Sequence, residues 1–301
     1  MTLLRRPMRW IDPARAAAAL AQRHGEQGLI WLDGDGGALG RNITLAVDPV
    51  EQHCCRGLPG DADARNPFTT LRELTTGHWT GWLSFDAAAW TEPGNPWRRD
   101  RMASLWIARH DPVLRFDLGT EELVLEGVDP DRYSAMENLL GSLGEDTVPE
   151  DPPHPLGCTW KRQSDRNTFM AGVIRIRELI ASGDLFQANL TSCATTELQA
   201  PLSNLDLYGR LRRRCPAPFS GVLIGSGAAA GEAVLSTSPE RFLQVDPEGS
   251  VQTRPIKGTR PRHADPLIDD VLAAELVCSA KDRAENVMIV DLLRNDLGRV
   301  C

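Results

Sequence analysis

The sequence lacks any long run of apolar residues. Its opening, MTLLRRPMRW, contains no stretch long enough for the apolar region of a signal peptide, and no later segment approaches the ~20 residues that cross a bilayer. These absences predict a cytoplasmic protein without a membrane partner. The length of 301 residues, with 42% hydrophobic and 25% charged content, is typical of a globular chain that can bury a sizeable core.

Cysteines at metal-site spacing are also missing. The seven cysteines form no CxxC pair and the six histidines are scattered, which argues against a zinc site or a disulfide framework and favours reduced thiols. Positive charge is in the minority, because the net charge is −8. This balance argues against nucleic acid or an anionic membrane as the main partner.

Lysine is scarce. The 33 basic residues include only Lys161, Lys257 and Lys281. Arginine stays protonated at any ordinary pH, whereas a desolvated lysine can lose its proton and attack an electrophile. A lysine kept in such a chain is therefore a candidate nucleophile, and Lys257 in RPIKGTR (residues 254–260) is the one of interest. A surface lysine retained by chance explains the same residue equally well.

The composition of one segment divides the chain. Residues 144–158, GEDTVPEDPPHPLGC, are acidic, rich in proline and without periodicity, as expected of an exposed connection. We therefore expect an N-terminal region over residues 1–145, a linker over 146–158 and a second region over 159–301.

Local patterns predict the elements of both regions. The first has strand-like runs at 28–33, 42–47, 81–90 and 103–110, and contains seven of the eight tryptophans, which are expected to pack sheets. In the second, the apolar spacing predicts a helix over 165–184 that stops at Gly183, followed by a strand over 185–191. A hairpin is expected over 233–256 around the turn at 247–250, and a long helix from about 267 to 295.

The predicted hairpin brings Glu240 and Lys257 to one end of the same sheet region. Glu240 follows Ser238-Pro239, and the proline restricts the direction of the chain. A carboxylate near a lysine is either a surface ion pair, worth under about 1 kcal/mol, or a general acid beside a nucleophile. The spacing alone favours the ion pair.

A second carboxylate lies within the apolar face of the last predicted helix. Glu285 falls on the face formed by Cys278, Ile289 and Leu292, so it is expected to face the core. A buried carboxylate needs a cation, a metal ion or a proton. Lys281, four residues earlier, offers an ordinary intrahelical pair, whereas a magnesium ion held by Glu285, with weaker help from Asp282, is the alternative.

Six motifs follow one another along the chain: GWLSFD (81–86), GDLFQANLT (183–191), PAPFSGVL (216–223), SPERF (238–242), TRPIKGTRPR (253–262) and SAKDRAENVMIVDLLRNDLGRVC (279–301). In this order they resemble the motifs of the chorismate-utilising enzymes, the family of anthranilate synthase component I, aminodeoxychorismate synthase component I and the isochorismate and salicylate synthases. The resemblance implies an α+β fold of packed antiparallel sheets with outer helices, built jointly by both regions.

Within that family the lysine of PIKGT is typical of the aminodeoxychorismate synthase branch, whereas anthranilate synthases usually have alanine there. The resemblance implies that Lys257 attacks C2 of chorismate and that Glu240 protonates the departing C4 hydroxyl. Gly258 and Thr259 match the loop beside the ring, and Glu285 matches a magnesium ligand. The ammonia added at C4 would come from a separate glutamine amidotransferase subunit, and the product would serve para-aminobenzoate and folate synthesis.

The family's pattern continues well past residue 301. We therefore expect a fold and an active site that are incomplete at the C-terminus of this sequence, as in a fragment. Two alternatives to the aminating enzyme remain: anthranilate synthase component I, which Lys257 argues against, and a non-catalytic fragment.

Overall fold

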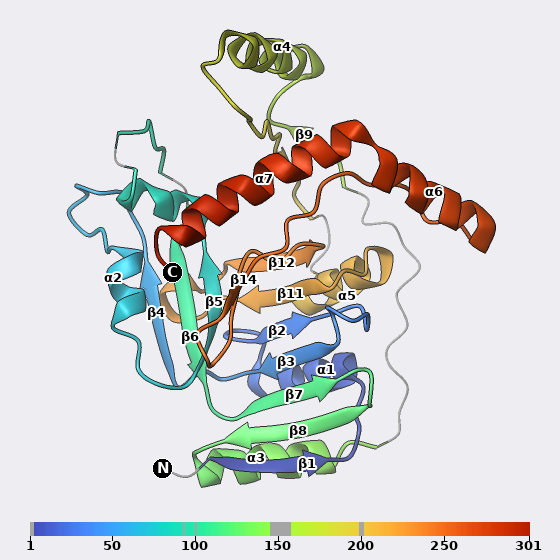
Figure 1. The fold of residues 1–301 in the computed structure, drawn as a ribbon. Coiled ribbons are helices and arrows are strands. Elements are labelled where there is room, and N and C mark those ends of the chain that lie inside the picture. Colours follow the sequence, from blue (N-terminus) through green and yellow to red (C-terminus); the bar gives the residue numbers. More distant parts are fainter. Residues whose placement is uncertain (1–2, 93, 100, 145–157, 199–201) are drawn as a thin grey trace.

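The computed structural model describes residues 3–92, 94–99, 101–144, 158–198 and 202–301. Two antiparallel sheets form its centre (Figure 1). The larger has the order β1-β8-β7-β3-β2-β11-β12 and the smaller the order β4-β6-β5. Their bounds, in sheet order, are β1 Leu4–Met8, β8 Glu122–Gly127, β7 Val113–Asp117, β3 Asn42–Ala46, β2 Ile30–Asp33, β11 Phe219–Ile224 and β12 Ala233–Ser238, then β4 Glu51–Cys55, β6 Leu105–His110 and β5 His78–Leu83.

The large sheet is covered on both faces because its strands alternate apolar side chains between them. Trp31 and Leu45 face a core shared with the helices α1 (Pro13–His24), α3 (Pro130–Gly141) and α5 (Asn204–Arg214). Ile30 and Ala46, next to them in sequence, face a second core shared with the small sheet. The second region supplies β11 and β12, so both regions build the large sheet, as the resemblance implied.

Several helices begin with the same local signal. Asp or Asn at the N-cap is followed directly by proline, and the side-chain oxygen accepts hydrogen bonds from the first backbone N–H groups. This pattern starts α1, α3, α2 (Pro67–Arg72) and α6 (Pro266–Cys278). Among the described residues no helix is both long and apolar enough to span a membrane.

The tryptophan-rich segments pack the sheets as predicted. Trp82 of β5 and Trp106 of β6 have ring centroids 4.9 Å apart, and both belong to the core between the two sheets. The predicted run over 81–90 is only partly a strand, because β5 ends at Leu83 and a 3-10 helix, η1 (Phe85–Trp90), follows. Cys54 and Cys55 lie in β4, and neither forms a disulfide in the described structure.

The second region differs from the prediction in three places. Helix α4 (Arg166–Ser182) forms and ends at Gly183 in the left-handed conformation, but residues 185–191 form no strand. The hairpin is a short pair, β13 (Gln244–Val245) with β14 (Val251–Gln252), separate from β12. The expected single helix is two, α6 and α7 (Ala280–Gly298), which meet at Ser279.

Helices α4, α6 and α7 bury almost nothing. Among their residues only Asp282 is buried. The stripe of α7 expected to face the core is only partly covered, because Glu285 and Ile289 are half-buried whereas Leu292 is 52% exposed. The expectation that it faces the core was wrong, because no residue of α7 belongs to either core cluster. The remaining short elements are η2 (Gly227–Ala229) and the pair β9 (Lys161–Arg162) with β10 (Ala194–Thr195).

Candidate functional site

Glu240 lies just beyond the end of β12, where a turn fixes its backbone. The Ser238 hydroxyl donates to the Glu240 carbonyl at 2.9 Å and accepts from the Glu240 amide at 3.3 Å. The carboxylate then reaches across to the loop at 253–262, where Oε1 accepts the backbone N–H of Ile256 at 3.1 Å. Glu240 therefore contacts the loop that carries Lys257, although neither residue lies within a strand.

Lys257 follows directly after the residue that Glu240 holds. Its Nζ donates to the Ile256 carbonyl at 3.0 Å, and the residue is half-buried. In the described part of the chain no ion pair joins Lys257 to Glu240. The surface ion pair that the spacing favoured is thus not formed. The Glu240 carboxylate and the Lys257 amine each bond to the backbone of Ile256, the carboxylate to its N–H and the amine to its carbonyl.

Gly258 is required by its conformation and by its neighbours. Its φ is +75°, in the region that L side chains rarely adopt. A Cβ here would lie 2.7 Å from Cγ of Asp282 and 2.9 Å from Cδ1 of Leu276. The loop therefore packs directly on the junction of α6 and α7. Thr259, the next residue, is exposed.

Asp282 and Glu285 present their carboxylates one turn apart on α7. Lys281 Nζ lies 3.2 Å from Glu285 Oε2 and 3.4 Å from Asp282 Oδ1, so the intrahelical pair considered from the sequence is present. Hydrogen bonding with Ser279 is the main cause that lowers the pKa of Asp282, and the Lys281 and Arg260 charges add to it.

The donor set fits a hard cation only in part. Carboxylate oxygens are the ligands that magnesium prefers, and the ion is commonly held by one or two of them together with waters and substrate oxygens. Glu285 and Asp282 supply such oxygens, but the Lys281 ammonium group already pairs with both carboxylates. The described residues contain no group of three or more acidic, histidine or cysteine side chains that could hold a metal ion alone.

Arg260 is a contact residue that the sequence reasoning missed. Its Nε donates to Glu275 Oε1 at 3.0 Å, and its Nη1 lies 3.3 Å from Asp282 Oδ2. The signal was present in the sequence, because Arg260 lies inside TRPIKGTRPR, but only the lysine and its two following residues had been singled out.

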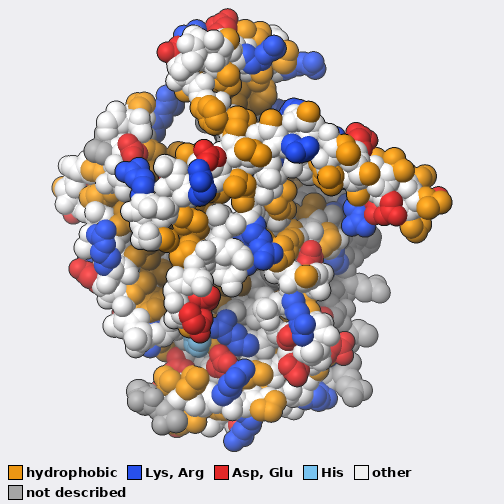
Figure 2. All heavy atoms as spheres, viewed as in Figure 1, with side chains coloured by type: hydrophobic (Ala, Val, Ile, Leu, Met, Phe, Trp, Pro, Cys, Tyr) orange, Lys and Arg blue, Asp and Glu red, His pale blue; other side chains and the backbone are white. Residues whose placement is uncertain are grey.

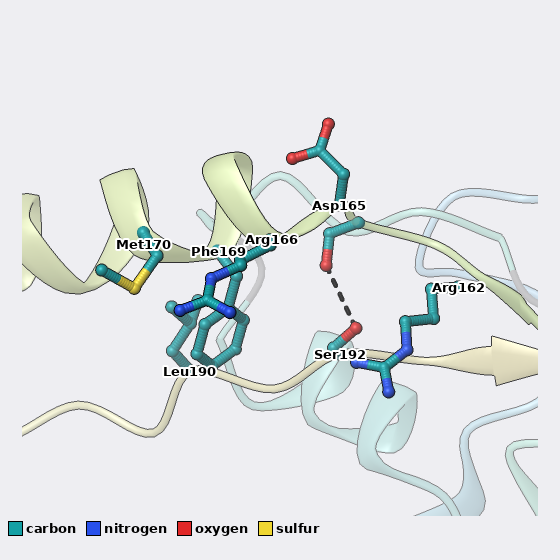
Figure 3. A pocket seen from close by; sticks show the side chains of 8 residues that line it. Arg162, Asp165, Arg166, Phe169, Met170, Leu190 and Ser192 are labelled. Atoms are coloured by element: carbon teal, nitrogen blue, oxygen red, sulfur yellow. Dashed lines mark hydrogen bonds between the residues drawn. The ribbon is translucent and has the colours of Figure 1, made fainter.

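Two cavities lie away from this cluster. One of about 520 Å³ opens beside the start of α4, where Arg162, Arg166 and Phe169 line it and the hydroxyls of Ser164 and Ser192 are 3.1 Å apart (Figure 3). The other, of about 320 Å³, lies between β14 and the second half of α7. Neither includes Glu240 or Lys257.

Comparison with known proteins supplies the class. Residues 38–301 match the family model described as chorismate binding enzyme, so the chain belongs to that family. It is 40% identical over 169 residues to aminodeoxychorismate synthase component 1 of Klebsiella aerogenes, covering 56% of this chain and 36% of that protein. It is 33% identical over 231 residues to an anthranilate synthase component I-like protein of Synechocystis sp., covering 75% of this chain and 45% of that one.

A solved structure shares the fold. Anthranilate synthase component I from Streptococcus pneumoniae TIGR4 superposes with a TM-score of 0.63 at 20% identity, over 86% of this chain and 62% of that chain. The expected α+β fold of the chorismate-utilising enzymes is thereby confirmed. The chain spans less than half the length of the two curated relatives it matches here.

Proposed function

We propose that this chain carries the nucleophile and the acid of an enzyme that aminates chorismate at C4 to give 4-amino-4-deoxychorismate. The observation that supports the proposal most is the hydrogen bond from the Ile256 amide to the Glu240 carboxylate, because Ile256 directly precedes Lys257. The similarity to curated aminodeoxychorismate synthases supports the same chemistry. We propose folate synthesis in the cytoplasm as the setting of this reaction.

In the proposed reaction one difficult displacement becomes two. The neutral amine of Lys257 forms a bond to C2 of chorismate, both ring double bonds shift toward C4, and the C4–O bond breaks. Glu240 gives its proton to the departing hydroxyl, which leaves as water. Ammonia then bonds to C4, both double bonds shift back, the C2–N bond breaks to release the lysine amine, and the proton that the new C4 ammonium loses returns to Glu240. Arginine at 257 could not perform either step.

The remaining groups bind and orient. Gly258 and Thr259 form the loop beside the ring, and the absence of a side chain at Gly258 lets that loop approach α7. Glu285, with weaker help from Asp282, would hold a magnesium ion, whose chemistry is to neutralise a carboxylate of the substrate. A glutamine amidotransferase subunit is the proposed source of ammonia.

The test uses the purified chain with chorismate, a magnesium salt and an ammonium salt, and chromatography of the products. We expect 4-amino-4-deoxychorismate from the natural sequence and none from Lys257→Ala or Lys257→Arg, with Lys161→Ala as the control that keeps activity. Product made equally by Lys257→Ala contradicts the nucleophile. No product from any variant, with chorismate bound, supports a non-catalytic fragment.

A second candidate, the synthesis of anthranilate, rests on one observation. The match to the anthranilate synthase component I-like protein covers more of this chain than the match to the Klebsiella enzyme does. The same chromatogram separates the two, because anthranilate is fluorescent and 4-amino-4-deoxychorismate is not aromatic.

A further inference from the structure

Arg260 connects three segments through one guanidinium group. Its Nε donates to Glu275 of α6, and its Nη1 both lies 3.3 Å from Asp282 of α7 and donates to the Thr259 carbonyl at 2.9 Å. The Arg260 side chain is only 25% exposed. A planar, multiply bonded guanidinium has little freedom to leave such a position.

The anchor on α7 is itself fixed. The Asp282 side chain is 8% exposed, and in the described structure no other residue of α7 is buried. Its amide is capped by the Ser279 hydroxyl at 3.3 Å, so it belongs to the first turn of α7. Gly258 lies against the same carboxylate. Asp282 is therefore shared by the guanidinium and the lysine loop.

We propose that Arg260 is a positioning residue, which clamps the loop at 256–260 onto the start of α7 and so sets Lys257 at a fixed place relative to Glu240 and Glu285. It acts through the loop and touches no reacting atom. Its consequence for turnover rests on the proposed function, whereas the clamp itself is a property of the chain.

Arg262, two residues after Arg260, provides a matched control for the Arg260 variants. Arg262 pairs in a bidentate manner with Asp269 of α6, with contacts of 2.7 to 3.0 Å. Its side chain is 89% exposed and it makes no contact to α7 in the described structure. Arg262→Gln therefore removes a nearby ion pair to α6 and leaves the contacts of Arg260 with Glu275 and Asp282 in place.

The first readout is independent of activity. Because the chain has three lysines, an amine-reactive reagent followed by mass spectrometry reports the labelling rate of Lys257 separately, with Lys161 as the internal reference. Hydrogen exchange of the Ile256 amide reports whether its bond to Glu240 persists. In Arg260→Gln we expect roughly tenfold faster exchange, the change for one lost charge-assisted hydrogen bond, and an altered Lys257 labelling rate.

The controls decide the outcome. Arg260→Lys is expected to recover part of the protection, and Arg262→Gln to stay within about twofold of the natural sequence. Asp282→Asn, which keeps the size of the side chain, is expected to behave as Arg260→Gln does. Equal effects of Arg260→Gln and Arg262→Gln, or none from either, overturn the clamp. Exchange in β11 must stay unchanged, which separates local release from general unfolding.

Turnover gives a second, separate readout. A clamp that sets the place of Lys257 predicts a lower kcat in Arg260→Gln with KM little changed, and partial rescue in Arg260→Lys. If the natural sequence itself makes no product, the proposed function fails while the exchange and labelling results still decide the clamp.

Discussion

At the residue scale, both the backbone conformation and the packing require glycine at position 258. Both its positive φ and the approach of Asp282 exclude a Cβ. Gly249, in the turn between β13 and β14, has a similar φ of +87° but nothing within 4 Å of where a Cβ would lie. Comparing the two positions separates backbone strain from steric collision.

We predict that Gly258→Ala loosens the lysine loop and Gly249→Ala does not. Strain costs about 1–2 kcal/mol at either position, but only residue 258 adds the collision. The measurement is the rate at which trypsin cleaves after Lys257. Within residues 254–260 trypsin cleaves only there, because Arg254 and Arg260 are each followed by proline. A cleavage rate in Gly258→Ala no faster than in Gly249→Ala contradicts the packing argument.

His110 is a buried residue that titrates outside the site. Its Nε2–H donates to the Gly28 carbonyl at 2.8 Å, which joins the end of β6 to the approach of β2. Burial lowers the pKa of His110 to about 4, from about 6.5 in the unfolded chain. The unfolded state therefore binds more protons between these values, and stability is lost as the pH falls through that window.

We predict that His110 lowers the free energy of unfolding by about 3 kcal/mol as the pH falls from 6.5 to 4. His110→Gln keeps a donor for Gly28 but does not titrate, so its stability should fall less over the same window. Urea unfolding at a series of pH values measures both. Parallel pH profiles would show that His110 is not the cause.

At the scale of elements, one buried ion pair attaches α5 to the large sheet. Arg212 Nε lies 2.7 Å from Asp33 Oδ2 and the Tyr208 hydroxyl donates to the same oxygen at 2.9 Å. The Asp33 side chain is 1% exposed. The guanidinium also lies 5.0 Å from the centre of the Trp31 ring. These contacts link the helix of the second region to a strand of the first.

We predict that Arg212→Leu lowers the free energy of unfolding by about 3 kcal/mol, because it leaves the Asp33 carboxylate buried without its cation. The double variant Asp33→Asn with Arg212→Leu also removes the carboxylate charge, and it should recover part of the lost free energy of unfolding. Thermal unfolding of the single and double variants tests this. A double variant less stable than either single one speaks against the pair.

The sequence predicted elements well where local signals were strong. The helix ending at Gly183 and the tryptophan-bearing strands follow from periodicity and stop signals that act within one segment. Residues 185–191 are apolar enough for a strand, but a strand needs a neighbour with which to pair, and no described segment provides one there. Pairing partners are not a local property.

The candidate site was predicted in part for the same reason. The approach of Glu240 to the lysine loop followed from the hairpin, and its contact is made through the Ile256 amide. The role of Arg260 depends on where α6 ends and α7 begins, and the sequence was interpreted as one continuous helix. The break at Ser279 is what brings Asp282 under Gly258.

At the scale of the whole molecule, the core is unevenly distributed. The two buried clusters draw on both sheets and on α1, α3 and α5, but on no residue of α4, α6 or α7. Helix α4 lies apart from the sheets in Figure 1, and apolar side chains extend along α6 and α7 in Figure 2. Leu267, Val271 and Val277 are each at least 66% exposed.

We predict that this face makes the isolated chain self-associate, since exposed apolar patches of this kind favour burial against another surface. Sedimentation should show larger species as concentration rises, together with binding of a dye specific for apolar surfaces. Val271→Glu with Val277→Glu should reduce both effects, and Val245→Glu, outside α6, should not. A chain that stays monomeric and binds no dye would refute this prediction.

The measurement that tests the central claim most directly is a search for the covalent intermediate. The chain is mixed with chorismate and a magnesium salt without ammonia, quenched, digested and analysed by mass spectrometry. The account predicts an adduct of chorismate less one water on Lys257, absent from Lys161 and Lys281, and lost when an ammonium salt is added. Amination that proceeds with no adduct on Lys257, or unchanged in Lys257→Ala, would contradict it.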